Sequence, residues 1–219
     1  QLASVSFGGG TPSLFSANVI TQVLEHADKK IGLQANLEIT LEANPGSADI
    51  ARFSDYHSAG VTRLSLGVQS FSDTQLLALG RIHNSLQARQ AVDMAADAGF
   101  AYVNIDLMHG LPEQNIDLAA QDIDTAIALE PNHLSLYQLT LEPNTRFAAQ
   151  PPVLPDEATC WQIRSLFEET AISAGYEQYE VSAFARSGSR CSHNLNYWSF
   201  GDYLGIGAGA HGKVTSPNG

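Results

Sequence analysis

Residues 86–108 read LQARQAVDMAADAGFAYVNIDLM, a helical pattern followed by a short apolar run. Apolar residues recur in Leu86–Ala98 at the spacing of one helix face. Gly99 then suits the left-handed position that ends many helices. Tyr102–Met108 is rich in Val, Ile and Leu, as buried strands are. The segment therefore predicts a helix, a hinge and a strand in that order.

The same hinge occurs three times, as Ala59-Gly60-Val61, Ala98-Gly99-Phe100 and Ala174-Gly175-Tyr176. Around these hinges, apolar runs alternate with longer helical patterns. The predicted strands are Ala3–Phe7, Leu37–Glu42, Arg63–Val68, Tyr102–Met108, His133–Leu139 and Gln178–Ser182. The predicted helices are Ala17–Ile31, Ala48–Ala59, Leu86–Ala98, Ile116–Leu129 and Asp156–Ala174. We expect Ser16 and Ser47 to cap helices with their hydroxyls, and Gly32, Gly60, Gly99 and Gly175 to end them.

Alternation of this kind, with continuous apolar strands, predicts an α/β fold with a parallel sheet that is buried on both faces. No dinucleotide-binding fingerprint follows the first strand, which favours a partial barrel over an open doubly wound sheet. No linker or low-complexity segment interrupts the chain. Residues 1–219 are therefore expected to form one partial-barrel core.

Composition excludes several classes of function. The 219 residues include 11 Lys and Arg against 23 Asp and Glu, a formal net charge of −12. Nucleic acids are bound through clustered basic side chains, so no nucleic-acid partner is expected. Cys160 and Cys191 form neither a CxxC pair nor a disulfide framework, which is typical of a reducing cytoplasm. No apolar run reaches the roughly 18 residues of a membrane span.

Candidate ligand-binding residues lie where the predicted strands end, which is where α/β barrels carry their sites. Gly8, Gly9 and Gly10 follow the first strand and can present bare N–H groups to a carboxylate or phosphate. A plain flexible turn is an equal alternative. Glu42, after the second strand, could accept a hydrogen bond from a ribose hydroxyl or an amine, or could be an ordinary surface acid.

The next strands add three further candidates. Gln69 offers an amide donor and acceptor. Arg81 could hold a carboxylate through a bidentate fork, or form a solvated ion pair. Asp106 interrupts an apolar strand, where an unpaired acid is costly to bury. Together with Glu42 and the glycine loop, these groups suit a zwitterionic nucleoside ligand.

Four segments resemble the radical S-adenosylmethionine (SAM) enzymes of the coproporphyrinogen dehydrogenase type. They are Phe7–Pro12 (FGGGTP), Glu42–Pro45 (EANP), Leu64–Phe71 (LSLGVQSF) and Asn104–Pro112 (NIDLMHGLP). The tail Cys191–Trp198 (CSHNLNYW) is similar to the HNxxYW motif of the haem chaperone branch of this family. The resemblance implies a partial (β/α)6 barrel, TIM-like and of radical SAM type. It also implies SAM contacts at Gly9, Gly10, Thr11, Glu42, Gln69, Arg81 and Asp106.

The resemblance further implies a [4Fe–4S] cluster held by a CxxxCxxC motif in a loop after the first barrel strand. This chain has no such motif. We therefore expect a core truncated at both ends, with the first strand and the cluster cysteines upstream of Gln1. The chain as given is then not expected to perform radical chemistry, and no catalytic residue is assigned.

Three hypotheses for function remain open. The first is a cytoplasmic haem chaperone that binds haem and passes it to haem-accepting proteins, with any membrane contact made by the acceptors. His193 and Cys191 are its candidate haem ligands, because imidazole and thiolate both ligate haem iron; a packed loop is the alternative for this motif. The second is an oxygen-independent coproporphyrinogen III oxidase, which decarboxylates the propionates of a porphyrinogen. The third is a generic barrel that binds an anion at Gly8–Gly10.

Overall fold

The computed structural model describes residues 1–216, except for the side chains of Ser47 and Ala48. Within this part of the chain, seven strands form one sheet in the order β1-β2-β3-β4-β5-β7-β6. The strands are β1 (Leu2–Phe7), β2 (Leu33–Ala43), β3 (Arg63–Gln69), β4 (Tyr102–His109), β5 (His133–Gln138), β6 (Glu177–Gln178) and β7 (Ala183–Ala185). Strands β1 to β5 pair in parallel, whereas β7 pairs antiparallel with both β5 and β6. The predicted partial barrel is thus confirmed, with a short antiparallel hairpin at one edge.

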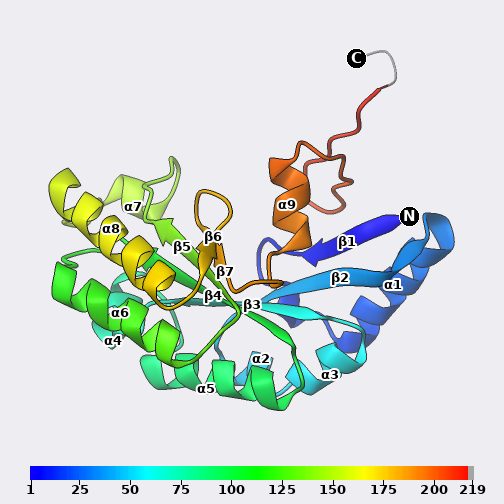
Figure 1. Ribbon diagram of the computed structural model, residues 1–219, viewed down its shortest axis with the longest axis horizontal. Helices are drawn as coiled ribbons and strands as arrows, with labels where there is room; N and C mark the ends of the chain where they lie inside the picture. Colours follow the sequence, from blue (N-terminus) through cyan, green and yellow to red (C-terminus); the bar gives the residue numbers. More distant parts are fainter. Residues whose placement is uncertain (217–219) are drawn as a thin grey trace.

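Most helices cover one face of the sheet, and α9 stands on the other (Figure 1). They are α1 (Ala17–Lys30), α2 (Ser47–Ile50), α3 (Phe53–Ser58), α4 (Asp73–Ala78), α5 (Ser85–Asp97), α6 (Ile116–Ala128), α7 (Arg146–Ala149), α8 (Glu157–Ser173) and α9 (Ser192–Trp198). A single 3₁₀ turn, η1 (Pro12–Leu14), precedes α1. No helix among the described residues is long and apolar enough to cross a membrane.

Two predicted elements are wrong in their extent. The expected strand Gln178–Ser182 is a turn between β6 and β7, closed by bonds from Gln178 Nε2 to the Val181 carbonyl (3.2 Å) and from Ser182 N to Glu180 Oε2 (3.1 Å). The expected helix Ala48–Ala59 is divided into α2 and α3. Arg52 lies at the break and donates from its guanidinium to the carbonyls of Ser13 and Leu14.

The helix ends follow the prediction more closely. Gly32, Gly60, Gly99 and Gly175 all have positive φ, between 87° and 99°. Ser16 lies at the N-cap of α1, but its hydroxyl makes no capping bond, so that part of the prediction is wrong. The side chain of Ser47 lies outside the described residues.

The central strands are largely buried on both faces, as predicted, but only one face of the sheet is apolar. Side chains alternate along each strand, and Leu41, Leu64 and Ile105 pack among the helices. The opposite side, called here the inner face, carries polar side chains in register. Glu42 is level with Ser65, Ser65 with Asn104, and Asn104 with His133.

Candidate functional site

The glycine loop after β1 lies against the end of β2. Gly9 N donates to Glu42 Oε2 at 3.2 Å. A Cβ added to Gly8 would lie only 2.7 Å from Glu42 Oε1, so glycine is what lets the carboxylate approach the backbone here. Gly9 and Gly10 both have positive φ, 73° and 55°, and leave open space where side chains would stand. Thr11 follows as a half-buried residue before η1.

Asp106 lies half-buried on the inner face. Its carboxylate accepts from Asn104 Nδ2 at 2.7 Å and from Ser65 Oγ at 3.3 Å. Burial raises the pKa of Asp106 to about 6; the bond from Asn104 lowers it, and the negative charge of Glu42 raises it. A cationic ligand group placed beside these two acids would restore the ionised form of Asp106.

Arg81 and Gln69 are the remaining candidate binding residues at this end of the sheet. Arg81 forms no ion pair within the described part of the chain. Burial lowers its pKa, and the charge of Asp106 acts in the opposite direction. Gln69 is buried and has a φ of 71°, a conformation that costs a non-glycine residue energy and is concentrated at ligand sites. The structure therefore brings Glu42 to Gly9 and Asp106 near Arg81, as the positions of the strand ends predicted.

Asn104 is the residue of this site that sequence reasoning missed. Its Nδ2 donates to Asp106 and to Ser65 Oγ (2.8 Å). Its Oδ1 accepts from His133 Nδ1 (2.6 Å) and from Ser135 Oγ (3.0 Å). The signal was present in the sequence, because Asn104 and Asp106 share one face of an otherwise apolar strand.

The two haem candidates, Cys191 and His193, lie apart from these residues, at the start of α9. Glu38 Oε1, from β2, accepts from Cys191 Sγ (3.3 Å), Ser192 N (2.8 Å) and His193 N (3.3 Å). Burial raises the pKa of the Cys191 thiol to about 11, and the charge of Glu38 raises it further. The thiol is thus protonated at neutral pH and donates to Glu38, whereas His193 is half-buried.

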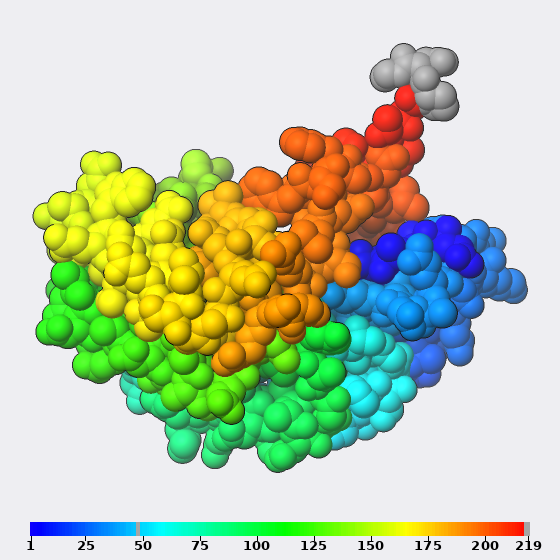
Figure 2. Space-filling view, in the orientation of Figure 1, coloured from blue at the N-terminus to red at the C-terminus, as the bar shows by residue number. Residues whose placement is uncertain are grey.

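A cavity of about 330 Å³ opens beyond the end of α9. Its walls are Tyr197, Trp198, Phe200, Gly201, Tyr203 and Lys213. Tyr197 lies one helical turn after His193 and so shares its side of α9. The space-filling view shows this end of the chain projecting from the rest of the surface (Figure 2).

The described residues do not fit an iron–sulfur cluster. They contain no group of three or more His, Cys, Asp or Glu side chains placed to hold a metal ion. Cys160 lies on α8 and Cys191 precedes α9, so the two thiols come from different elements.

Comparisons with known proteins agree with this geometry. A family model described as the Radical SAM superfamily matches residues 1–124. The heme chaperone HemW of Haemophilus influenzae is 53% identical over 219 residues, which are 100% of this chain and 57% of that protein. Radical S-adenosyl methionine domain-containing protein 1, mitochondrial, of Mus musculus is 43% identical over 98% of this chain and 50% of its own length. The chain thus spans about half the length of the curated relatives it matches.

Among solved structures, the coproporphyrinogen III oxidase HemN of Escherichia coli, described as a radical SAM enzyme, is similar with a TM-score of 0.81. The match covers 96% of this chain and 52% of that chain, at 24% sequence identity. At this identity the similarity shows the fold alone. It supports the partial barrel that the alternation of strands and helices predicted.

Proposed function

Because this chain belongs to the radical SAM superfamily, we propose that it binds SAM at the carboxyl ends of its strands and that the full-length protein is a haem chaperone. The relatives named HemW support the second part, since their printed name is heme chaperone. In this proposal the protein binds haem and transfers it to haem-accepting proteins in the cytoplasm. Cys160 and Cys191 form neither a disulfide framework nor a CxxC motif, which is consistent with that compartment.

The proposed SAM site uses the residues at the strand ends. Gly9, Gly10 and Thr11 supply a backbone that a ligand can approach closely, and Glu42 and Asp106 supply acceptors for its amino or hydroxyl groups. Arg81, which lacks an ion pair among the described residues, is placed to pair with the ligand carboxylate. When bound, SAM supplies a carbon–sulfur bond that a reduced [4Fe–4S] cluster can cleave. The described residues offer no ligands for such a cluster, so we assign this chain the binding of SAM and not its cleavage.

The single observation that carries the haem proposal is the position of His193 one turn before the aromatic cavity of α9. A neutral imidazole ligates haem iron, and aromatic walls favour a flat apolar ring. Lys213 also lines the cavity, but its ammonium group already pairs with Asp202 (3.3 Å) and donates to the Phe200 carbonyl (2.7 Å), so we assign it no contact with haem. The protonated thiol of Cys191 is a poorer ligand, so the proposed axial ligand is His193.

Titration of haem into the full-length protein tests this proposal through the Soret band. We expect stoichiometric binding by the wild type and at least a tenfold weaker affinity with a shifted Soret band for His193→Ala. The matched control is His26→Ala, which removes an exposed histidine from α1 and should leave both unchanged. Unaltered binding by His193→Ala would remove His193 from the site, and no binding by the wild type would exclude the chaperone function.

The enzymatic alternative, oxidative decarboxylation of coproporphyrinogen III, is supported by the fold of HemN alone. Anaerobic incubation of the full-length protein with substrate, SAM and reductant decides it. Formation of protoporphyrinogen would favour this alternative over the chaperone.

A further inference from the structure

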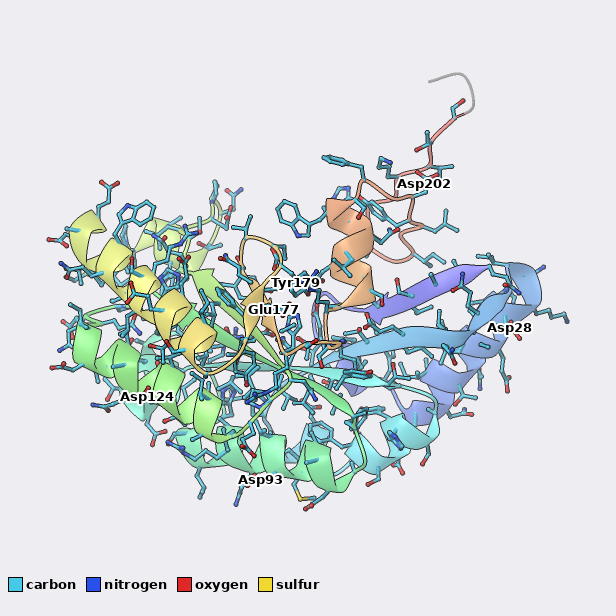
Figure 3. All side chains as sticks on the ribbon, viewed as in Figure 1. Asp28, Asp93, Asp124, Glu177, Tyr179 and Asp202 are labelled. Atoms are coloured by element: carbon cyan, nitrogen blue, oxygen red, sulfur yellow. The ribbon has the colours of Figure 1, made fainter. Side chains whose placement is uncertain are left out.

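The first turn of α9 is attached to the inner face of the sheet by two side chains. Glu38 accepts from the amides of Ser192 and His193, as described above. The hydroxyl oxygen of Tyr179, in the turn between β6 and β7, accepts from Cys191 N and from Asn194 Nδ2, both at 3.2 Å. Figure 3 shows Tyr179 next to the lower end of α9. The backbone that presents His193 is therefore oriented by residues of the sheet and of its hairpin.

From Tyr179 the hydrogen bonds continue to the proposed SAM site. The Tyr179 hydroxyl lies 2.7 Å from His133 Nε2, and the opposite ring nitrogen, Nδ1, lies 2.6 Å from Asn104 Oδ1. The amide of Asn104 then donates to Asp106 at 2.7 Å. Four bonds thus join a SAM-site carboxylate to the first turn of α9, and each intermediate side chain is at least half-buried.

The donor and the acceptor of every hydrogen bond in this network follow from the group at its end, the carboxylate of Asp106. Asn104 must turn its NH₂ group toward the carboxylate of Asp106, which leaves Oδ1 to accept. We therefore assign the proton of His133 to Nδ1. Burial lowers the pKa of His133 to about 3, so the ring is neutral and its Nε2 accepts from Tyr179. Tyr179 consequently has only its oxygen lone pairs left for Cys191 and Asn194.

This hydrogen-bond network has little freedom to rearrange. All four hydrogen-bonding positions of the Asn104 amide are occupied, by Asp106, Ser65, His133 and Ser135. Turning the amide over would set its NH₂ group against the donating Nδ1 of His133 and leave buried groups unpaired, which is costly. A ligand that draws Asp106 toward itself therefore acts on the hydrogen bond between Asp106 and Asn104, because the Asn104 amide is held in place by its other partners.

We propose that His133 and Tyr179 are positioning residues that link Asp106 to the first turn of α9, so that SAM binding orders the segment that carries His193. The inference rests on the proposed SAM site, but it does not require that haem binds. It assigns SAM a role beyond its own binding, as a ligand that prepares Cys191–Asn194 for a second ligand. The two sites are separate, and the network is the physical connection between them.

Amide hydrogen exchange of the full-length protein, carrying its cluster, tests this linkage. On addition of saturating SAM we expect exchange at residues 191–195 to slow by at least about fivefold, the lower end of typical couplings between sites. Tyr179→Phe removes the hydroxyl that joins His133 to Cys191, and should abolish this SAM-dependent slowing while SAM still binds. The matched control is Tyr176→Phe, which removes a buried hydroxyl that donates to the Pro131 carbonyl (2.5 Å) outside the network, and should keep the slowing intact.

Equilibrium dialysis of SAM with the same samples separates the outcomes. Equal slowing in Tyr179→Phe and Tyr176→Phe, or none in the wild type despite bound SAM, would overturn the linkage. Failure of the wild type to bind SAM would overturn the proposed SAM site and the linkage with it. His133→Asn provides a second variant, since it keeps a donor for Asn104 but cannot reach Tyr179; it must reproduce the loss seen in Tyr179→Phe.

Discussion

Asp122 places a carboxylate inside the molecule, between α6 and the turn that follows β3. It accepts from Ser70 Oγ at 2.7 Å and from Phe71 N at 2.6 Å. Burial raises the pKa of Asp122 to about 6, although both hydrogen bonds lower it. These bonds hold the backbone that immediately follows Gln69, so Asp122 supports the strained residue of the proposed SAM site without touching a ligand.

This raised pKa predicts a pH-dependent stability. The folded state holds the proton of Asp122 more tightly than the unfolded state does, so the stabilisation is complete below about pH 4 and is lost as the pH rises through 6. Asn at this position does not titrate. Relative to the wild type, Asp122→Asn should therefore gain about 2 kcal/mol in free energy of unfolding between pH 4 and pH 7.

Urea denaturation at several pH values measures this difference. Asp124→Asn, on the exposed side of the same helix (Figure 3), is the matched control and should run parallel to the wild type. A constant difference between Asp122→Asn and the wild type across this range would contradict the prediction.

The proposed SAM contacts make a second prediction at the residue scale. Glu42→Gln and Asp106→Asn each replace a charged acceptor by a neutral group of similar shape. Hydrogen bonds to charged groups contribute about 1.5–3 kcal/mol, so each variant should weaken SAM binding by the full-length protein by about 10- to 100-fold. Equilibrium dialysis measures the affinity, and Glu25→Gln, an exposed acid on α1, should bind as the wild type does. Unchanged affinity in both site variants would favour a generic anion site at the glycine loop.

At the scale of elements, a buried ion pair ties the chain before α9 to β2 and β3. Arg63 donates to Glu38 Oε2 from Nε (3.1 Å) and Nη2 (3.0 Å), and Nη2 also donates to the carbonyl of Ser189 (3.0 Å). The guanidinium lies over the ring of Tyr102, 4.9 Å from its centroid. Glu38 can therefore accept hydrogen bonds from the first turn of α9, because Arg63 balances its charge.

Removal of Arg63 should accordingly destabilise the fold. Arg63→Met leaves Glu38 charged, largely buried and without its cation, a change that costs about 3–5 kcal/mol in other proteins. Arg190→Met is the matched control, because it removes a cation whose pair with Glu177 is exposed and contributes less than about 1 kcal/mol. Chemical denaturation of both variants compares them directly, and equal losses would show that the Arg63 pair contributes no more than a surface pair.

At the scale of the whole molecule, the sheet order sets the distribution of stability. β3 and β4 have strands on both sides, whereas β6 is a two-residue edge strand with exposed side chains. In native-state hydrogen exchange we expect the amides of β3 and β4 to be the slowest, and those of β6 to be the fastest of the sheet. Protection of β6 equal to that of β3 would contradict this view of the sheet.

Much of the architecture could be predicted from the sequence because it depends on neighbours in the chain. Glycines at Gly60, Gly99 and Gly175 mark helix ends, since few other residues adopt positive φ without cost. Glu42 and Asp106 were identifiable because a carboxylate at the end of an apolar strand, or within one, is conspicuous. Resemblance in the separate motifs then indicated the radical SAM family, which the family comparison shows.

The remainder depended on contacts between distant parts of the chain. The break at Arg52 follows from carbonyls of Ser13 and Leu14, and no local pattern reveals that contact. The network from Asp106 through Asn104 and His133 to Tyr179 depends on the register of β4 and β5, and a slip of one residue would turn each side chain to the other face. By itself the sequence determined the long helices α1, α5, α6 and α8, the hinges and the candidate residues at the strand ends, because local backbone preference and burial period decide them. Only the tertiary structure decided which polar groups meet on the inner face, because those partners are chosen by sheet pairing and not by proximity in the chain.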